Sequence, residues 1–255
     1  MSIYACSDIH GQYDLYRKML EDINFSDEDT LYVLGDMIDR GPKSMEVILD
    51  VMSRKNVIAL LGNHELLMYN HLAWKNYAFR DTWLYPQNGG KANEEAFLAL
   101  SAQDQERVLD YVKNLPLQIE VQVGGKPFLL SHSFYVPEEG TVYWKDMPDD
   151  VVFDTVWCSP WRENEYVPLQ FYMSDQHIHV IGHVPVHMID AWPEELAEDD
   201  LPVAWFSPIC RVVNIDLGCA LLAHPMDDVW RGLCLMDLEA YARGEGKNAF
   251  RYYQG

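Results

Sequence analysis

The chain has 255 residues, of which 49% are apolar, and it carries 40 acidic against 19 basic side chains. This length and apolar content suffice for one substantial core, and we expect a single domain over residues 1–255. The formal charge of −21 repels polyanions and anionic membranes at long range, which argues against nucleic acid and membrane as partners.

The first residues and the cysteines indicate a soluble, cytoplasmic protein. Residues 1–7 lack the basic segment of a signal peptide, and no apolar run approaches the roughly 20 residues of a membrane span. The five cysteines are odd in number, scattered, and form no CxxC pair. Free thiols in a reducing compartment are therefore favoured over disulfides.

Three strand–loop–helix units are predicted in the first part of the chain. Helices are expected over residues 12–23, after Pro42 in a first helical turn, and from about residue 64. Repeated units of this kind build a parallel sheet through right-handed crossovers. The apolar strands that open the units are predicted over residues 3–7, 30–34 and 57–61.

The rest of the chain is predicted to add a helical stretch over residues 92–114 and a second sheet. A hairpin is expected to turn at Gly124 and Gly125. Residues 191–208, rich in proline, acidic residues and tryptophan, are interpreted as a surface loop. The strands of the second sheet are predicted over residues 117–123, 127–131, 177–181, 211–215 and 232–237.

Polar side chains that suit metal ions follow five of the predicted strands. In open α/β sheets ligands bind at the carboxyl ends of strands, so we expect these side chains to converge. The alternative for Asp8 or Asn63 individually is that each caps the following helix. The residues are Asp8 and His10 after the first strand, then Asp36, Asn63, His132 and His183 after later ones.

The loop after the second strand carries residues that suit a phosphoryl group. Gly35 and Gly41 allow tight turning and close approach of the backbone to a ligand. The guanidinium of Arg40 presents paired donors that match phosphoryl oxygens, although a structural ion pair is the alternative.

The remaining histidines and several tryptophans are interpreted as mainly structural. Alternation along a strand directs one of His177 and His179 inward. Core or loop anchoring is favoured over a substrate-facing wall for Trp144, Trp157, Trp161 and Trp205. Structural or surface roles are expected for His71, His177, His179, His187 and His224.

Three blocks of the sequence resemble the signatures of the phosphoprotein phosphatase family, within the calcineurin-like metallophosphoesterases. They are Ser7-Asp-Ile-His-Gly11, Gly35-Asp-Met-Ile-Asp-Arg-Gly41 and Gly62-Asn-His-Glu65. His132 and Gly182-His183 match the family's later histidine ligands. The resemblance covers nearly the whole chain, and two further segments are similar to the bacterial and phage serine/threonine phosphatases: Asn88-Gly-Gly90 and Asn214-Ile-Asp-Leu-Gly218.

The resemblance implies an α/β fold, a four-layer α-β-β-α sandwich of two mixed sheets that holds two divalent metal ions. Manganese is the expected metal, and iron or zinc also suits a mixed oxygen and nitrogen ligand set. Asp36 would bridge the ions. The implied ligands are Asp8, His10 and Asp36 for one ion, and Asp36, Asn63, His132 and His183 for the other.

The resemblance also implies a mechanism, in which a metal-bridging hydroxide attacks phosphorus in line with the leaving oxygen. Arg40, Asn63 and Arg162 would hold the phosphoryl oxygens. His64 would protonate the leaving group, and Asp39 would orient the His64 imidazole. Arg162 is assigned because a basic residue follows a tryptophan in related enzymes.

Three departures from the family pattern bear on the substrate. Ser7 replaces the usual glycine before the first aspartate, and Leu217 stands where bacterial relatives often have threonine. Ser133 and Phe134 follow His132 where small residues are usual. None of these changes removes an implied ligand or the implied acid.

The expected activity is that of a serine/threonine protein phosphatase, or of one that also accepts phosphotyrosine. It hydrolyses phosphomonoesters, with a phosphorylated protein or peptide, or a small phosphate ester, as the substrate. The alternative is hydrolysis of dinucleoside polyphosphates such as diadenosine tetraphosphate, since a similar family shares the three blocks. Retention of Asp39, Arg40 and Glu65 favours the phosphatase. The negative charge and Arg40 disfavour a nuclease or cyclic-nucleotide phosphodiesterase, and the complete ligand set disfavours a scaffold that only binds phosphoproteins.

Overall fold

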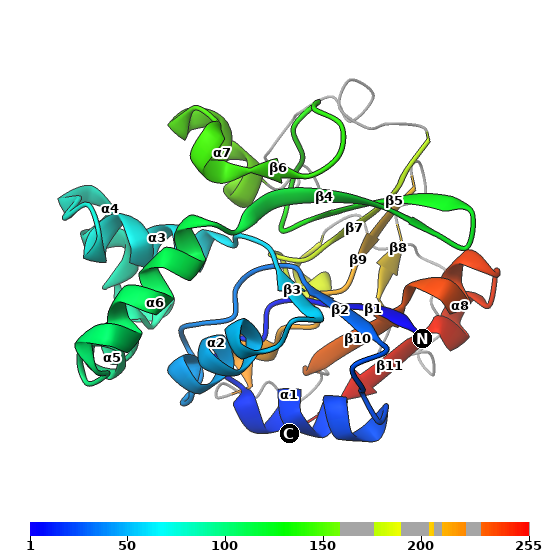
Figure 1. Cartoon of the computed structure of the whole chain (residues 1–255), viewed down its shortest axis with the longest axis horizontal. Helices are drawn as coiled ribbons and strands as arrows, with labels where there is room; N and C mark the ends of the chain where they lie inside the picture. Colours follow the sequence, from blue (N-terminus) through cyan, green and yellow to red (C-terminus); the bar gives the residue numbers. More distant parts are fainter. Residues whose placement is uncertain (159–175, 190–203, 207–210, 223–230, 255) are drawn as a thin grey trace.

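Two mixed β-sheets form the centre of the molecule (Figure 1). This computed structural model describes residues 1–158, 176–189, 204–206, 211–222 and 231–254. The strand order is β11-β10-β1-β2-β3 in the first sheet and β6-β4-β5-β7-β9-β8 in the second. The α/β sandwich predicted from the sequence is confirmed.

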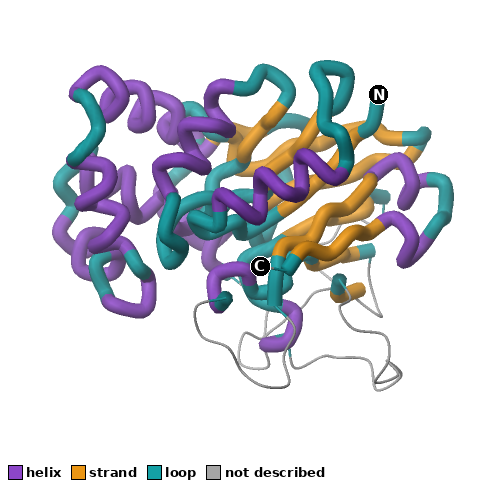
Figure 2. The backbone as a smooth tube through the Cα atoms, turned by 90° about the horizontal axis from the view of Figure 1, so that it is seen from below, coloured by secondary structure: helices purple, strands orange, loops and turns teal. Residues whose placement is uncertain are grey.

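The three predicted strand–loop–helix units build the parallel half of the first sheet. β1 (Ile3–Cys6), β2 (Thr30–Val33) and β3 (Val57–Ala59) run parallel. Their helices are α1 (Tyr13–Asp22), α2 (Ser44–Ser53) and α3 (Asn63–Leu72). Figure 1 places α1 and α2 below this sheet, and helices cross in front of its strands in Figure 2.

The expected place of Pro42 in a first helical turn was wrong. α2 begins at Ser44 after the N-cap Lys43, so Pro42 precedes the helix. Ser44 instead closes the preceding loop, because its hydroxyl accepts the backbone N–H of Asp39 at 2.9 Å. The proline therefore belongs to the loop that carries the polar residues.

Two antiparallel strands complete the first sheet, and the sheet of one of them was predicted wrongly. β10 (Leu233–Asp237) pairs with β1, and β11 (Phe250–Tyr253) pairs with β10. Residues 232–237 were expected in the second sheet. Their continuous apolar run predicts a buried strand but does not identify its partner, because either sheet of a sandwich can bury such a strand. The short helix α8 (Leu238–Ala242) lies between these strands in the sequence.

The second sheet contains the predicted hairpin and the predicted parallel strands. β4 (Pro116–Val123) and β5 (Lys126–Ser131) pair antiparallel. Gly124 and Gly125 have φ of +56° and +76°, which is the left-handed backbone that favours glycine in a two-residue turn. β7 (Ile178–Ile181) lies parallel to β5, and β9 (Val212–Asn214) lies parallel to β7.

Short strands form both edges of the second sheet. β6 (Val142–Tyr143) pairs with β4, and β8 (Trp205–Phe206) pairs antiparallel with β9. The prediction of an irregular loop over residues 191–208 is therefore wrong at 205–206. The residues 191–203, 207 and 208 lie outside the described part of the chain.

Further helices gather at one end of the sandwich, together with α3 (Figure 1). The stretch predicted over residues 92–114 is divided because Ser101 caps a new helix, its hydroxyl accepting the N–H of Asp104 at 3.1 Å. The α-helices after α3 are α4 (Tyr77–Trp83), α5 (Gly90–Leu98), α6 (Ala102–Lys113) and α7 (Asp149–Trp157). The 3-10 helices include Pro86–Asn88, Trp144–Asp146, Val186–Met188, Cys219–Leu221 and Gly246–Ala249.

The buried side chains form two layers of core on either side of the first sheet. Tyr4 and Cys6 pack against the helices, whereas Ala5 between them packs toward the second sheet. β2 alternates in the same way, with Leu31 toward the helices and Tyr32 toward the second sheet. This period of two determines which side chains of each strand point to the region between the sheets.

His179 is buried in the second sheet, as strand alternation predicted for one of the two nearby histidines. Its Nε2 lies 2.7 Å from the hydroxyl oxygen of Ser131, and its ring contacts that of Tyr135. His177 is half-buried instead and forms an ion pair with Glu120.

Two other sequence expectations can be compared with the described residues. The thiols of Cys6, Cys219 and Cys234 are free, and Cys210 lies outside the described residues. Among the helices that the structure describes, none combines the length and apolar character that crossing a bilayer requires.

His179 should make stability depend on pH. Burial lowers the pKa of its imidazole from 6.5 to about 3, so the ring stays neutral in the folded protein where the unfolded chain protonates it. Its stabilisation is complete above pH ~6.5 and is lost as the pH falls toward 3, by about 2 kcal/mol at pH 5. In urea unfolding at pH 7 and pH 5, His179→Gln should lose less stability between the two pH values than the wild type. An equal loss would contradict a neutral buried ring.

Candidate metal centre

Five strand-following loops bring the six predicted ligands into one buried cluster. The Asp36 carboxylate is central, with one oxygen 3.4 Å from His10 Nε2 and the other 3.5 Å from His132 Nε2. The convergence predicted from the strand order is therefore observed. The cluster consists of Asp8, His10, Asp36, Asn63, His132 and His183.

The backbone of these loops adopts conformations that non-glycine residues rarely occupy. Asp8, Asp36 and His183 have φ of +51°, +51° and +70°. Each such residue costs about 1–3 kcal/mol, which the surrounding structure must offset, and such residues concentrate at functional sites. Gly35 is required where it stands, because a Cβ there would lie 2.7 Å from the Gly62 backbone. The loops are thus packed closely together, and their backbone is strained.

His10 presents an unprotonated nitrogen toward Asp36. Its Nδ1 lies 2.9 Å from the carbonyl oxygen of Ile38, and since a carbonyl only accepts, Nδ1 must carry the proton. Nε2 therefore keeps its lone pair, 3.4 Å from Asp36 and 3.9 Å from Asp8. This arrangement is the usual means by which a protein orients a metal-binding imidazole.

The second half of the cluster surrounds the side-chain oxygen of Asn63. This oxygen lies 3.0 Å from His132 Nε2, 3.2 Å from His183 Nδ1, and 3.0 and 3.2 Å from the two Asp36 oxygens. His132 Nδ1 donates to the Leu34 carbonyl at 2.7 Å, so its Nε2 also carries a lone pair. Lone pairs facing one another repel, unless the amide turns its nitrogen inward or a cation lies among them.

Burial makes the negative charge of this cluster costly without a cation. Burial raises the pKa of Asp8 well above its ordinary value, and the neighbouring charges of Asp216 and Asp36 raise it further. Burial likewise raises the pKa of Asp36 and that of Asp216 to about 7. One Asp8 oxygen has no hydrogen-bond partner among the described residues. Three buried carboxylates with two imidazole lone pairs and an amide oxygen fit divalent cations.

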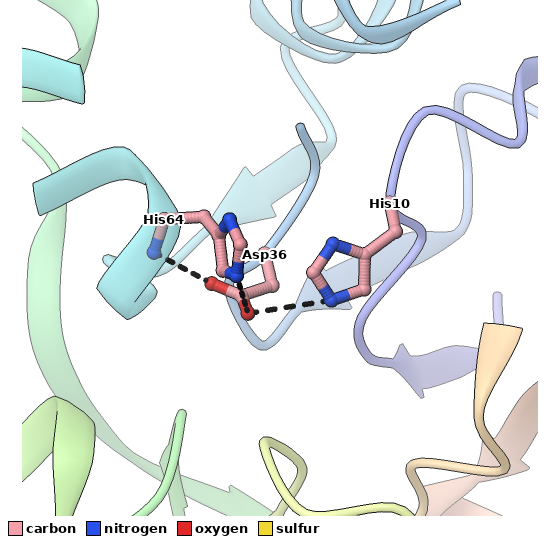
Figure 3. Close-up of side chains that lie close together, drawn as sticks. All are labelled: His10, Asp36 and His64. Atoms are coloured by element: carbon pink, nitrogen blue, oxygen red, sulfur yellow. Dashed lines mark hydrogen bonds and ion pairs between the residues drawn. The ribbon is translucent and has the colours of Figure 1, made fainter. Parts of the chain in front are cut away.

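A histidine–aspartate pair stands at the edge of the cluster. His64 Nδ1 lies 2.6 Å from an Asp39 oxygen, and both side chains are about 1% exposed. Its Nε2 has no hydrogen-bond partner among the described residues and lies 3.9 Å from Asp36. Figure 3 shows His10 and His64 on opposite sides of the Asp36 carboxylate. His10, Asp36 and His64 can also be grouped as three potential ligands of one ion.

Asp36 and Glu65 connect the loops to the start of α3. One Asp36 oxygen accepts the backbone N–H of His64 at 3.0 Å, so this carboxylate lies at the positive end of the helix. Glu65 accepts three backbone N–H groups, from Asp36 at 2.9 Å, Met37 at 2.8 Å and Gly62 at 3.1 Å. Neither α1 nor α3 has a side-chain cap from Asp8 or Asn63, so the capping alternative for these two residues is not observed.

Of the other residues considered in the sequence analysis, some lie near the cluster, one lies in the core, and two lie outside the described residues. Arg40 is exposed, takes part in none of the ion pairs found among the described residues, and places Nη1 3.0 Å from His10 Nε2. The ring of Trp157 approaches that of His183, so it lines this region, whereas Trp144 is a core anchor. Arg162 and Trp161 lie outside the described residues.

Sequence reasoning gave no role to two buried residues of this region. Asp216 follows β9 and adds a third carboxylate beside Asp8. Trp83, the last residue of α4, donates its indole N–H to Asp39 at 2.7 Å. In the sequence, the segment that contains Asp216 is similar to a family segment, but this similarity assigns no role to Asp216. No sequence motif marks α4 or its Trp83. Ser7, noted as a departure, donates its hydroxyl to the Asp8 carboxylate.

Comparison with known proteins identifies the family of this chain. The model of the calcineurin-like phosphoesterase family matches residues 1–220, and the chain therefore belongs to that family. Members of the family use a dinuclear metal centre.

The curated relatives carry a more specific name. A protein of Nitrosococcus oceani named "Bis(5'-nucleosyl)-tetraphosphatase, symmetrical" is 36% identical over 119 residues, covering 46% of this chain and 38% of that protein. An Actinobacillus pleuropneumoniae protein with the same name is 27% identical over 194 residues, covering 75% of this chain and 62% of the relative. This chain thus spans less than two thirds of the length of these relatives.

A solved structure shows the same fold. A protein serine/threonine phosphatase of Saccharomyces cerevisiae superposes with a TM-score of 0.57 at 14% identity, covering 100% of this chain and 80% of that one. At this identity the likeness concerns the fold alone. The names of the curated relatives fit the dinucleoside polyphosphate alternative at least as well as the protein phosphatase branch.

Metal binding should stabilise the folded chain, because cations would neutralise the buried carboxylates. We expect two Mn²⁺ ions per chain and, at 100 times the dissociation constant, about 2.7 kcal/mol of stabilisation from each ion, or a rise in Tm of roughly 5–10 °C per ion. Asp36→Asn should lose most of this rise, because the central carboxylate would be neutral. Glu120→Gln, which changes the half-buried carboxylate beside His177, serves as control. A rise in Asp36→Asn equal to the wild-type rise would exclude Asp36 as a ligand.

Proposed function

We propose that this chain hydrolyses phosphate esters at a dinuclear centre held by the six clustered residues. The observation that carries the proposal is the convergence of buried carboxylates and imidazole lone pairs on the region around Asp36. When bound, two divalent ions would supply Lewis acidity that lowers the pKa of a coordinated water. Manganese is proposed first, and a cytoplasmic location is proposed from the free thiols. The proposed ligands are Asp8, His10, Asp36, Asn63, His132 and His183.

Arg40 and Asn63 are proposed to hold the phosphoryl group. Arg40 is exposed and its guanidinium lies beside His10 at the edge of the cluster, where an incoming anion would meet it. The planar guanidinium can donate two hydrogen bonds to one phosphoryl group and offset the charge that develops on it. Arg162 keeps the same proposed role on the strength of the family resemblance alone.

His64 is proposed as the proton donor to the leaving group. Its Nδ1 is fixed by Asp39, so its Nε2 is free to carry the proton toward the substrate. Asp39 would also stabilise the charged imidazolium before the proton is given up. A proton donor matters most for a strongly basic leaving group such as an alkoxide, and least for a weakly basic one such as a nucleoside diphosphate.

The substrate class proposed first is the dinucleoside tetraphosphates, cleaved into two identical halves. Support comes from the names of the two curated relatives described above, which match this chain over only part of their length. The second candidate is a phosphomonoester of serine, threonine or tyrosine in a protein. The buried His64–Asp39 pair favours it, because an alkoxide leaving group needs the proton that such a pair provides.

Replacing His64 should test the proton donor directly. His64→Asn should lower kcat on an alkyl phosphate by about 10²-fold or more, which is the usual contribution of a positioned acid, while two metal ions remain bound. Metal content and kcat are measured on the same preparation. His177→Asn, a half-buried histidine paired with Glu120, is the matched control. Full activity in His64→Asn would remove this residue from the acid role.

Turnover of two substrates side by side should decide the substrate class. With manganese supplied, the first proposal expects a higher kcat/KM for diadenosine tetraphosphate, releasing two molecules of ADP, than for a phosphoserine peptide. A higher value for the peptide would favour the second candidate. If neither substrate is cleaved and the bound phosphopeptide stays intact, the chain acts as a binding scaffold and the hydrolase proposal fails.

A further inference from the structure

Two donors share one oxygen of the buried Asp39 carboxylate. The indole N–H of Trp83 lies 2.7 Å from Asp39 Oδ2, and His64 Nδ1 lies 2.6 Å from the same atom. Trp83 is 0% exposed and Asp39 is 1% exposed. A carboxylate with two donors on one oxygen cannot rotate without breaking both bonds, so the indole fixes the acceptor that orients the imidazole.

The chain brings Trp83 to this position with the Asn88-Gly-Gly90 turn. A Cβ on Gly90 would lie 2.8 Å from two atoms of the Trp83 ring and 2.3 Å from the Trp83 carbonyl oxygen. A Cβ on Gly89 would lie 2.5 Å from the backbone nitrogen of Arg40. The two glycines thus let one turn pack against the indole and against the loop that carries Arg40 and Asp39.

This packing gives the helical segment a direct connection to the metal-centre loops. Arg40 Nε donates to the carbonyl of Gln87 at 3.3 Å, one residue before the turn begins. The segment over residues 77–98 therefore contacts the second loop in three ways, through Trp83, Gly89 and Gln87. In the sequence, Gly89 and Gly90 belong to a segment that resembles the family, but the resemblance does not predict their contacts.

We propose that Trp83 is a positioning residue for the proton donor: its indole N–H holds Asp39, and through Asp39 it directs His64 Nε2 toward the substrate. This inference rests on the proposed function of His64. Trp83 itself touches neither the cluster of ligands nor the reacting atoms. Its loss should therefore act on proton delivery and not on the binding of metal or substrate.

The alternative is that Trp83 only fills space, because its large ring packs in the core and approaches His71. Trp83→Phe separates the two roles, since it removes the N–H while keeping most of the aromatic volume. The matched control is Trp144→Phe. Trp144 is 3% exposed, and it also donates its indole N–H, to the Val112 carbonyl at 2.9 Å. Trp144→Phe therefore removes an equivalent buried hydrogen bond elsewhere in the core.

The leaving group supplies a kinetic readout that a packing role would not reproduce. In Trp83→Phe, kcat on an alkyl phosphate should fall roughly 10-fold, within the usual effect of losing a partner that orients a site residue, with KM unchanged. The fall on 4-nitrophenyl phosphate should be much smaller, because that leaving group needs little protonation. In Trp144→Phe, kcat should change by the same factor, if at all, on the two substrates. Equal losses on both substrates in Trp83→Phe would overturn the inference.

A second variant and a metal-free measurement complete the test. Gly90→Ala should reproduce the selective loss, because its methyl group displaces the indole without removing the N–H. In metal-free protein labelled with ¹⁵N-histidine, the low-field proton of His64 Nδ1–H should shift in Trp83→Phe and stay in place in Trp144→Phe. An unmoved resonance in Trp83→Phe contradicts the positioning inference. Absence of turnover by the unmodified chain contradicts instead the proposed function, so the two failures are distinguishable.

Discussion

The concentration of negative charge around a buried Asp36 is the constraint on which the rest of the site depends. Its carboxylate accepts the His64 N–H, faces lone pairs of His10 and His132, and lies against the Asn63 amide. Burial raises the pKa of this group to about 7, even though the His64 N–H and the charge of Arg40 lower it, and this expresses the cost of the charge without a cation. The three backbone N–H groups that Glu65 accepts help to hold this arrangement in place against the backbone strain of the loops.

The sandwich supplies this arrangement because its parallel strands end along the same edge. β1, β2 and β3 deliver Asp8, Asp36 and Asn63 from the first sheet, and β5 and β7 deliver His132 and His183 from the second. The core layer between the sheets keeps the two sets of strand ends facing each other. The helices at one end add a different contribution, since α4 and the turn before α5 reach the loop that carries Asp39 and Arg40.

The sequence predicted what depends on local order and failed where distant pairing decides. Parallel strands, the Gly124–Gly125 hairpin and the cluster of six residues follow from alternating apolar runs with polar residues directly after them. The sheet of β10 could not be predicted, because a fully buried run does not specify its partner strand. Trp83 was missed for a related reason: it comes from a helix without a motif, and only the folded chain brings its indole to Asp39. Substrate class also lies beyond local sequence, because the same blocks serve more than one leaving group.

The central claim is that two cations lie on either side of the Asp36 carboxylate. Crystals grown with manganese, with anomalous diffraction recorded at the metal absorption edge, test it most directly. The account predicts two anomalous peaks, one between Asp36 and the side of His10 and Asp8, and the other between Asp36 and the side of Asn63, His132 and His183. A single peak, or peaks remote from Asp36, would contradict it.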